Sequence, residues 1–194
     1  LLVAVAQDAL LLEVADEGLG IVGDLAVVSQ RSEQSFATLH PVERLAGLVG
    51  PAARVGDVVC VRAFQASVGC VDASRGTLVG SKPTTGSQAV GADAALMVAA
   101  DAKDKLNAWK TSSGDTAWSH ERLLHRGLGG VAVLPKAVVV GDLDGVLHFF
   151  DRDTGATLQQ LPTEGGAVIG APVLAGRTLV VVKRSGAVVG VAVD

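Results

Sequence analysis

The sequence predicts an all-β protein, a partial β-propeller of four-stranded antiparallel blades, and three observations lead to this prediction. First, residues 137–159 read as an apolar strand, a tight turn, a second strand, a second turn and a third strand. Second, this unit occurs four times at intervals of about 40 residues, a period typical of propeller blades. Third, 24 Gly but only 6 Pro among 194 residues fit many tight turns rather than disorder.

The clearest copy of the unit shows why each part takes its structure. Ala137–Gly141 is an apolar run that suits a strand buried on both faces. Asp142–Gly145 is a tight turn that ends in a glycine able to take a positive φ. Val146–Phe150 is the second strand, with side chains that alternate between the two faces. Asp151–Gly155 then turns the chain into a third short strand, Ala156–Gln159.

The second turn of the unit has the strictest spacing. Its first residue and its glycine stand four positions apart in three copies: Asp72 and Gly76, Lys110 and Gly114, and Asp151 and Gly155. An Asp side chain in such a turn can accept hydrogen bonds from nearby backbone amides, and Gly supplies the left-handed residue. Four positions after each glycine stand Gly80, Trp118 and Gln159. Regular hairpins of a β-sandwich are the alternative, but the fixed offsets favour propeller blades.

The predicted blades cover residues 1–40, 51–80, 88–118, 131–159 and 170–194. The first blade is a degraded copy, in which Ala9–Ala15 is a strand. Residues 30–50 break the rhythm and are predicted to project from one rim, where the partners of propellers usually bind. The last blade has no outgoing strand, so a closed ring would need that strand from elsewhere.

Charge and hydropathy exclude several classes of function. A net charge of −4 gives no electrostatic reason to expect nucleic acid as a partner. No apolar run approaches the roughly 18 residues of a membrane helix.

The chain begins at Leu1 without a basic segment or cleavage site, so we expect a removed signal sequence or a fragment.

No catalytic or metal-binding residue is predicted, and no cofactor. The four histidines, at positions 40, 120, 125 and 148, lack the spacing of metal ligands. Asp142 and Asp144 could belong to a calcium loop, but the rest of the ligand series is missing, which favours turn chemistry.

Two further residue types have open interpretations. Cys60 and Cys70 lie on the two arms of one predicted hairpin. A two-residue loop would leave them out of direct register, so we expect free buried thiols rather than a disulfide. Trp118 follows its turn glycine by four positions and is either an ordinary core residue or a docking residue that stacks between neighbouring blades.

An ordered set of segments carries a resemblance to a known family. The segments are Glu43–Leu45, Trp118–Ser119, Leu123–Arg126, Val139–Asp142 with Gly145, Leu147–Phe149, and Gly170–Val173 with Ser185–Gly186. On these residues the chain resembles the PQQ-like repeat propellers and, among them, the BamB family of outer-membrane protein assembly lipoproteins of Gram-negative bacteria. The resemblance extends from about residue 43 to the end of the chain.

The resemblance implies a fold and a function. The fold would be about half of an eight-bladed ring, its C-terminal half. The function would be that of a periplasmic scaffold at the outer membrane, whose lipid-carrying N-terminal Cys is absent here because no cysteine precedes Cys60. Its expected partners are the POTRA domains of the barrel-assembly protein BamA and unfolded outer-membrane proteins awaiting insertion.

The same resemblance implies a partner-binding site and two departures from the family pattern. The expected site is Glu43, Arg44 and Leu45, in which Arg44 would pair with a partner carboxylate and Leu45 would be an apolar anchor. A solvated loop is the alternative for this segment. The family's acidic residues that follow it are replaced here by Gly47, Leu48 and Val49. Gly80 stands where a docking tryptophan is usual, so that blade contact should be weaker.

Two other functions would share this repeat. One is a PQQ-dependent dehydrogenase, which needs a calcium-bound quinone and commonly a pair of adjacent cysteines. Cys60 and Cys70 are not adjacent, and 194 residues are too few for a complete quinoprotein ring. The other is a propeller interaction domain that works in a different pathway.

Overall fold

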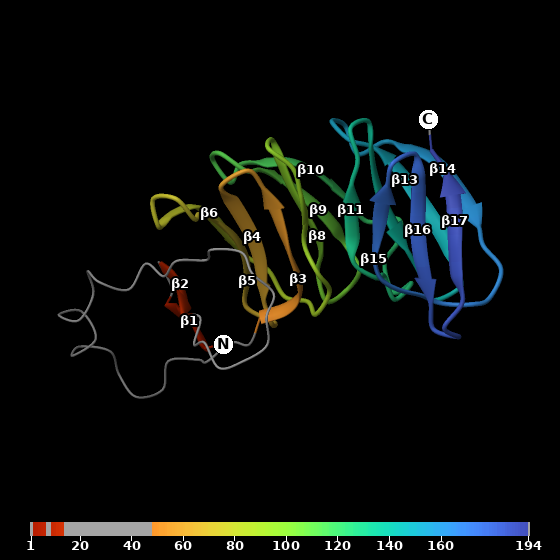
Figure 1. Cartoon of the computed structure of the whole chain (residues 1–194), viewed down its shortest axis with the longest axis horizontal. Helices are drawn as coiled ribbons and strands as arrows, with labels where there is room; N and C mark the ends of the chain where they lie inside the picture. Colours follow the sequence, from red (N-terminus) through yellow and green to blue (C-terminus); the bar gives the residue numbers. More distant parts are fainter. Residues whose placement is uncertain (1, 7–8, 14–47, 194) are drawn as a thin grey trace.

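The computed structural model describes residues 2–6, 9–13 and 48–193, and it is built of β-strands joined by turns and loops (Figure 1). Within these ranges no residue is helical, which confirms the prediction of an all-β fold. Accordingly, the described part of the chain holds no helix of the length and apolarity needed to cross a membrane.

Four antiparallel sheets follow one another along the chain, each made of strands that are consecutive in the sequence. Sheet 1 consists of β3 (Leu48–Val55), β4 (Val58–Ala63), β5 (Ser67–Asp72) and β6 (Thr77–Pro83). Sheet 2 consists of β7 (Gly91–Ala92), β8 (Leu96–Ala100), β9 (Leu106–Lys110) and β10 (Thr116–His120). Sheet 3 consists of β11 (Val131–Val133), β12 (Ala137–Gly141), β13 (Val146–Asp151) and β14 (Thr157–Pro162). Sheet 4 has three strands, β15 (Val168–Ala175), β16 (Thr178–Lys183) and β17 (Val188–Ala192).

The sheets stand side by side in chain order, from orange through green to blue in Figure 1, as blades of a propeller do. A separate hairpin of β1 (Leu2–Ala6) and β2 (Ala9–Glu13) precedes them. The rest of the expected first blade lies outside the described residues. Of the insertion expected at residues 30–50, positions 48–50 belong to β3 and the preceding ones lie outside the described ranges.

Three apolar cores fill the spaces between successive sheets. The core between sheets 1 and 2 includes Cys60, Val68, Cys70, Met97, Ala99 and Trp109. The core between sheets 2 and 3 includes Leu96, Val98, Leu106, Ala108, Trp118, Val138, Val140 and Phe150. The core between sheets 3 and 4 includes Val139, Leu147, Val168, Leu179 and Val181. Alternate residues of β8 and of β12 therefore enter different cores, which is why these strands read as continuous apolar runs.

The antiparallel order creates two distinct rims. One rim, here called the connector rim, carries the turns 64–66, 101–105, 142–145 and 184–187 and the sheet-to-sheet connections 84–90, 121–130 and 163–167. Backbone hydrogen bonds join these segments, for example from the Gln65 amide to the Gly86 carbonyl at 3.0 Å. The opposite rim, here called the hairpin rim, carries the other turns, among them 73–76, 111–115 and 152–156.

The turns on the hairpin rim have the chemistry that their spacing predicts. Asp72 accepts hydrogen bonds through Oδ1 from the Ser74 and Arg75 amides, each at 3.0 Å, and the Gly76 amide donates to the Asp72 carbonyl at 2.7 Å. Asp151 and Gly155 repeat this arrangement. The turn glycines at positions 76, 114 and 155 have φ values of 64°, 69° and 70°, a left-handed conformation in which glycine has no Cβ penalty.

Trp118 joins sheet 2 to sheet 3. Its side chain is buried, its Nε1 donates to the Arg152 carbonyl at 2.9 Å, and its ring lies against Gly155 so closely that a Cβ there would be 2.6 Å from the ring. Nη2 of Arg152 also forms an ion pair with Oδ2 of Asp93, which follows β7 in sheet 2, at 2.6 Å. Trp118 therefore stacks between neighbouring sheets, as a docking residue does.

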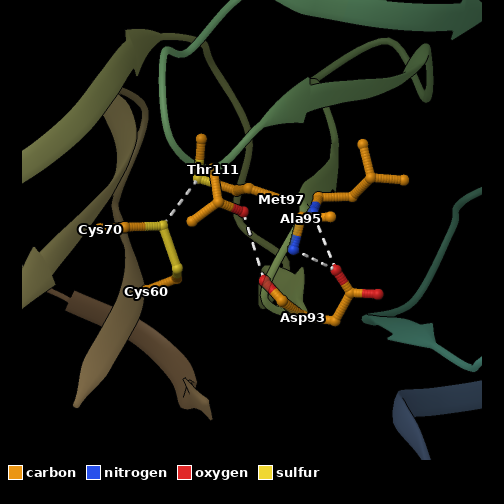
Figure 2. Close-up of a disulfide and its surroundings, with 7 residues drawn as sticks. Cys60, Cys70, Asp93, Ala95, Met97 and Thr111 are labelled. Atoms are coloured by element: carbon orange, nitrogen blue, oxygen red, sulfur yellow. Dashed lines mark hydrogen bonds between the residues drawn. A yellow bond between two sulfur atoms is a disulfide. The ribbon is translucent and has the colours of Figure 1, made fainter. Parts of the chain in front are cut away.

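The expectation of free thiols is wrong, because Cys60 and Cys70 form a disulfide (Figure 2). The loop between β4 and β5 has three residues, since Ala63 pairs with Ser67. That one additional residue places Cys60 directly opposite Cys70, with 4.0 Å between their Cα atoms. The sulfur of Cys70 also lies 3.5 Å from that of Met97 in sheet 2, so the disulfide belongs to the core between the two sheets.

Candidate interaction surface

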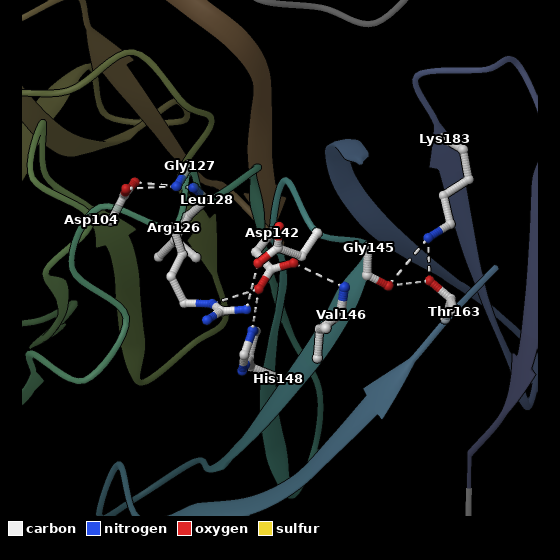
Figure 3. A network of polar contacts seen from close by, with 11 residues as sticks. Asp104, Arg126, Gly127, Leu128, Asp142, Gly145, Val146, His148, Thr163 and Lys183 are labelled. Carbon is white, nitrogen blue, oxygen red and sulfur yellow. Dashed lines mark hydrogen bonds and ion pairs between the residues drawn. The ribbon is translucent and has the colours of Figure 1, made fainter. Parts of the chain in front are cut away.

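A buried carboxylate organises the connector rim between sheets 2 and 3 (Figure 3). Asp142 has no exposed side-chain surface, and its Oδ2 accepts from Arg126 Nε at 2.7 Å and from His148 Nε2 at 2.8 Å. Its Oδ1 accepts from the Val146 amide at 2.9 Å. Because an ionised carboxylate only accepts, His148 carries a proton on Nε2. The Nη2 atom of Arg126 also forms an ion pair with Oδ2 of the exposed Asp144, at 3.0 Å.

The pKa of Asp142 lies below its ordinary value. Burial alone would raise this pKa, because a charged carboxylate loses hydration there. The hydrogen bonds from His148, Val146 and Arg126, together with the charge of Arg126, favour the ionised form more strongly. The site is therefore a fixed negative charge that holds the side chain of Arg126 in place.

The connection from sheet 2 to sheet 3 is anchored by a second carboxylate. Asp104 accepts hydrogen bonds from the amides of Gly127 at 2.8 Å and Leu128 at 3.0 Å (Figure 3). Asp104 and His125 both have positive φ, 66° and 64°, which L-residues seldom adopt. These bonds fix the path of the connection, and with it the position of Leu124 and Arg126.

Two buried cations bind the connections between the neighbouring pairs of sheets. Arg62 donates to the carbonyls of Thr85 at 2.9 Å and Ala100 at 2.6 Å, between sheets 1 and 2. Burial lowers the pKa of Arg62 to about 10, although the charge of Asp101 acts in the opposite direction. Between sheets 3 and 4, Lys183 Nζ donates to Thr163 Oγ1 and, at 3.1 Å, to the Gly166 carbonyl. Burial lowers the pKa of Lys183 as well.

Three large apolar side chains stand exposed on this polar rim. They are Phe64, Leu124 and Leu143, which are 49%, 39% and 48% exposed. A separate hollow of about 460 Å³ opens on the same rim between sheets 1 and 2, and its lining includes Thr85, Asp101 and Lys105. Large apolar side chains that are exposed on one rim are candidates for the apolar anchors of a protein-binding surface. The connector rim is therefore the candidate interaction surface.

The sequence-predicted site residues Glu43, Arg44 and Leu45 lie outside the described residues. Three positions after Leu45 the chain enters β3 at Leu48, which pairs with Ala63 beside the turn that carries Phe64. The strand order thus puts this entry point on the connector rim. Sequence reasoning missed Phe64, Leu124 and Leu143, because an apolar residue next to a strand is usually taken for core.

No group of three His, Cys, Asp or Glu side chains suited to a metal ion occurs in the part of the chain that the structure describes. Asp142 and Asp144 are engaged by Arg126 rather than arranged as a cation loop. The arrangement on this rim is suited to binding a macromolecule, through apolar anchors and fixed charges.

Residues 23–120 match the family model described as outer membrane protein assembly factor BamB. The chain belongs to the BamB family. The BamB of Burkholderia pseudomallei is 36% identical over 149 residues, which are 77% of this chain and 39% of that protein. The BamB of Bordetella pertussis is 30% identical over 76% of this chain and 39% of that protein.

A solved structure supports the same fold. The crystal structure of BamB from Moraxella catarrhalis superposes with a TM-score of 0.67 at 18% identity, over 77% of this chain and 44% of that one. The prediction of a BamB-type propeller with PQQ-like repeats is confirmed. The chain spans about two fifths of the length of the curated BamB relatives named above.

Proposed function

We propose that this chain is the part of an outer-membrane protein assembly factor that binds partners, and that it acts by binding rather than by catalysis. It would work at the periplasmic face of the outer membrane, tethered there by a lipid anchor. Its partners would be the POTRA domains of BamA and unfolded outer-membrane proteins. Membership of the BamB family is the observation that carries this proposal.

The surface proposed to bind BamA is the connector rim. Phe64 and Leu143 offer apolar anchors, and Arg126 is held in place by Asp142 so that little side-chain freedom is lost on binding. Glu43, Arg44 and Leu45 precede the strand that enters at this rim. Arg44 would pair with a partner carboxylate, and Leu45 would be an apolar anchor.

A capture experiment with the periplasmic domains of BamA tests this proposal. We expect Phe64→Ser combined with Leu143→Ser to weaken binding at least tenfold, because central apolar anchors commonly carry most of the binding energy. Arg44→Glu should also weaken capture, by reversing the charge opposite a partner carboxylate.

The matched control is Leu158→Ser, which removes a side chain that is 57% exposed on β14, away from the connector rim. It should bind like the wild type. Unchanged capture by the Phe64→Ser, Leu143→Ser double variant would exclude the connector rim as the BamA interface. Unchanged capture by Arg44→Glu would exclude the segment Glu43–Leu45 from that interface.

A further inference from the structure

Sheet 2 carries, in its turn on the connector rim, a carboxylate that is the counterpart of Asp142 in sheet 3. In each turn the amide of the aspartate donates to the carbonyl four positions later, from Asp101 to Lys105 at 2.9 Å and from Asp142 to Val146 at 3.1 Å. The amide of that later residue donates back to Oδ1, at 3.0 Å in the first turn and 2.9 Å in the second. Asp101 and Asp142 therefore hold equivalent positions in successive sheets.

The two carboxylates differ in what their second oxygen binds. Oδ2 of Asp142 accepts from Arg126 at 2.7 Å and from His148 at 2.8 Å (Figure 3). The hydrogen bonds of Asp101 go to Oδ1, and within the described part of the chain its Oδ2 has neither a hydrogen bond nor an ion pair. One oxygen of this half-buried carboxylate is therefore available to a donor from outside.

The connections between the sheets explain the difference. The connection 121–130 supplies Arg126, whereas the connection 84–90 is shorter and contains neither Arg nor Lys. Six positions after the aspartate, where sheet 3 has His148, sheet 2 has Asn107. The Nδ2 atom of Asn107 donates to a backbone carbonyl at 3.1 Å, which leaves its Oδ1 as an acceptor. Sheet 2 thus lacks both cation and imidazole at its carboxylate.

Asp101 and Asn107 line the hollow of about 460 Å³ between sheets 1 and 2. This volume lies within the range of about 300–1,000 Å³ found for ligand pockets. Ala66 and residues 83–85 of sheet 1 and its connection line the hollow from the other side, so it opens on the connector rim. Both sheets have four strands among the described residues, and the hollow lies between them.

The hollow lies where the next pair of sheets is filled by a histidine. The ring of His120 on β10 packs against Phe150 of sheet 3, with 4.5 Å between the ring centroids. The register makes Lys82 of β6 the counterpart of His120. The Cε atom of Lys82 lies beside Gly114 instead, and Trp109, the counterpart of Phe150, lines the hollow. The place of the imidazole is therefore open between sheets 1 and 2.

The charges around the hollow favour a cationic guest. Its charged lining residues are Asp101 and Lys105, and Nζ of Lys105 is already paired with Glu121 at 2.7 Å. The buried Arg62 lies near enough for its charge to interact with that of Asp101, but its two terminal nitrogens donate to backbone carbonyls. Of the two charged residues in the lining, Asp101 is the one without an ion-pair partner among the described residues.

A guanidinium suits these acceptors better than an ammonium does. Its planar fork can donate to a carboxylate and to a second oxygen at the same time, and it is more weakly hydrated than an ammonium. Oδ2 of Asp101 and Oδ1 of Asn107 are two such oxygens in the lining of one hollow. Arg126 already shows this chemistry at the equivalent carboxylate.

We propose that the hollow between sheets 1 and 2 binds an arginine side chain of a protein partner, whose guanidinium pairs with Oδ2 of Asp101. The bound arginine would act there as Arg126 acts at Asp142. The inference rests on the proposed function in one respect, that the connector rim binds protein, and it names a side chain that this rim receives.

Three model compounds titrated into the ¹⁵N-labelled chain test the proposal without BamA: acetyl-arginine-amide, acetyl-citrulline-amide and acetyl-lysine-amide. The arginine compound should give saturable shifts at the amides of Thr85, Lys105 and Asn107. The citrulline compound, which has a similar shape without the charge, should bind at least fivefold more weakly, and the lysine compound at least threefold more weakly. Equal affinity for the arginine and citrulline compounds, or no saturable shifts, would overturn the proposal.

The outcome is separate from that of the BamA capture experiment. If the arginine compound binds as expected but BamA is not captured, the arginine site stands and the proposed function fails. If BamA is captured but the arginine and citrulline compounds bind equally, the proposed function stands and the arginine site fails.

Variants of the carboxylate provide an internal check. Asp101→Asn removes the charge but keeps an oxygen that can accept from the Lys103 and Lys105 amides, and it should abolish the preference for arginine over citrulline. Asp115→Asn, which changes an exposed aspartate on the hairpin rim of the same sheet, should leave that preference unchanged. A preference that persists in folded Asp101→Asn contradicts the site. If that variant does not fold, Lys105→Gln decides, because loss of a cation from the lining must strengthen binding of the arginine compound at least twofold.

Discussion

At the scale of single residues, Asp142 links folding to pH. Its pKa is depressed in the folded state, so the carboxylate contributes stability above its unfolded pKa of about 3.9. That contribution is lost as the pH falls through the lower, folded pKa. We expect the free energy of unfolding to fall as the pH is lowered below about 5, as followed by urea unfolding at a series of pH values.

Asp142→Asn should lower the free energy of unfolding at pH 7 by about 2–3 kcal/mol, because Arg126 and His148 lose their buried anionic partner. The variant should also show a smaller dependence on pH in the acid range. Asp144→Asn is the matched control, since Asp144 is bound to the same Arg126 but is 73% exposed, and it should cost less than about 1 kcal/mol. Equal effects of the two substitutions would contradict the central place given to Asp142.

Gly155 and Gly176 require glycine for different reasons, close packing together with backbone conformation at Gly155 and backbone conformation alone at Gly176. Both have positive φ, 70° and 63°, but a Cβ on Gly155 would be 2.6 Å from the Trp118 ring, whereas a Cβ on Gly176 would meet nothing within 4 Å. Gly176→Ala should cost about 1–2 kcal/mol for the backbone conformation alone. Gly155→Ala should cost about 1–3 kcal/mol more, because the ring must move. Thermal unfolding of the two variants measures the difference, and similar melting temperatures would argue against close packing at Trp118.

The turn chemistry could be predicted from the sequence, whereas the burial of two cations could not. The turns at Asp72 and Asp151 were predictable, because an Asp and a Gly four positions apart specify their own hydrogen bonds locally. The burial of Arg62 and Lys183 was not predicted. A lysine or arginine next to a turn is usually solvated, and only the neighbouring sheet supplies the carbonyls that these two side chains bind.

At the scale of elements, the hairpin of β4 and β5 is closed by the Cys60–Cys70 disulfide. The bond spans 10 positions, and a loop of this size stabilises a fold by about 2–3 kcal/mol through the unfolded chain. Replacing both cysteines by alanine should lower the free energy of unfolding by about that amount. Thiol titration of the unfolded, unreduced protein should find no free thiol, and two free thiols there would refute the bridge.

The length of the β4–β5 loop explains why the two cysteines were incorrectly predicted to be free thiols. In an antiparallel hairpin, one additional loop residue changes which residues face one another. The sequence around Phe64 and Gln65 does not distinguish a two-residue loop from a three-residue one. The strands themselves were easier to predict, because the apolar run Ala137–Gly141 and its glycine-ended turn agree on one structure.

At the scale of the whole molecule, sheet 4 presents an apolar row to solvent. Ile169, Val182 and Val188 pair across its three strands and are 41%, 42% and 66% exposed. β17 has no further partner strand among those described, and it lies at one end of the row of sheets in Figure 1. An exposed apolar face beside an open strand edge promotes association.

We therefore expect the chain to self-associate as its concentration rises, and Val188→Lys to reduce that association. A lysine on an edge strand disfavours strand-to-strand contact without entering a core. Leu158→Lys, which changes an exposed apolar residue outside the row, should have little effect. Light scattering coupled to gel filtration measures the masses, and identical masses for wild type and Val188→Lys at every concentration would argue against this face.

The sharing of cores between sheets has a consequence for how the molecule opens. Sheets 2 and 3 bury both faces, whereas sheet 4 buries one. In a structure whose modules contact only their neighbours, local unfolding costs least at the end with the fewest contacts. Backbone amides of β16 and β17 should therefore exchange their hydrogens with deuterated solvent sooner than those of β8 and β12, whose sheets are covered on both faces.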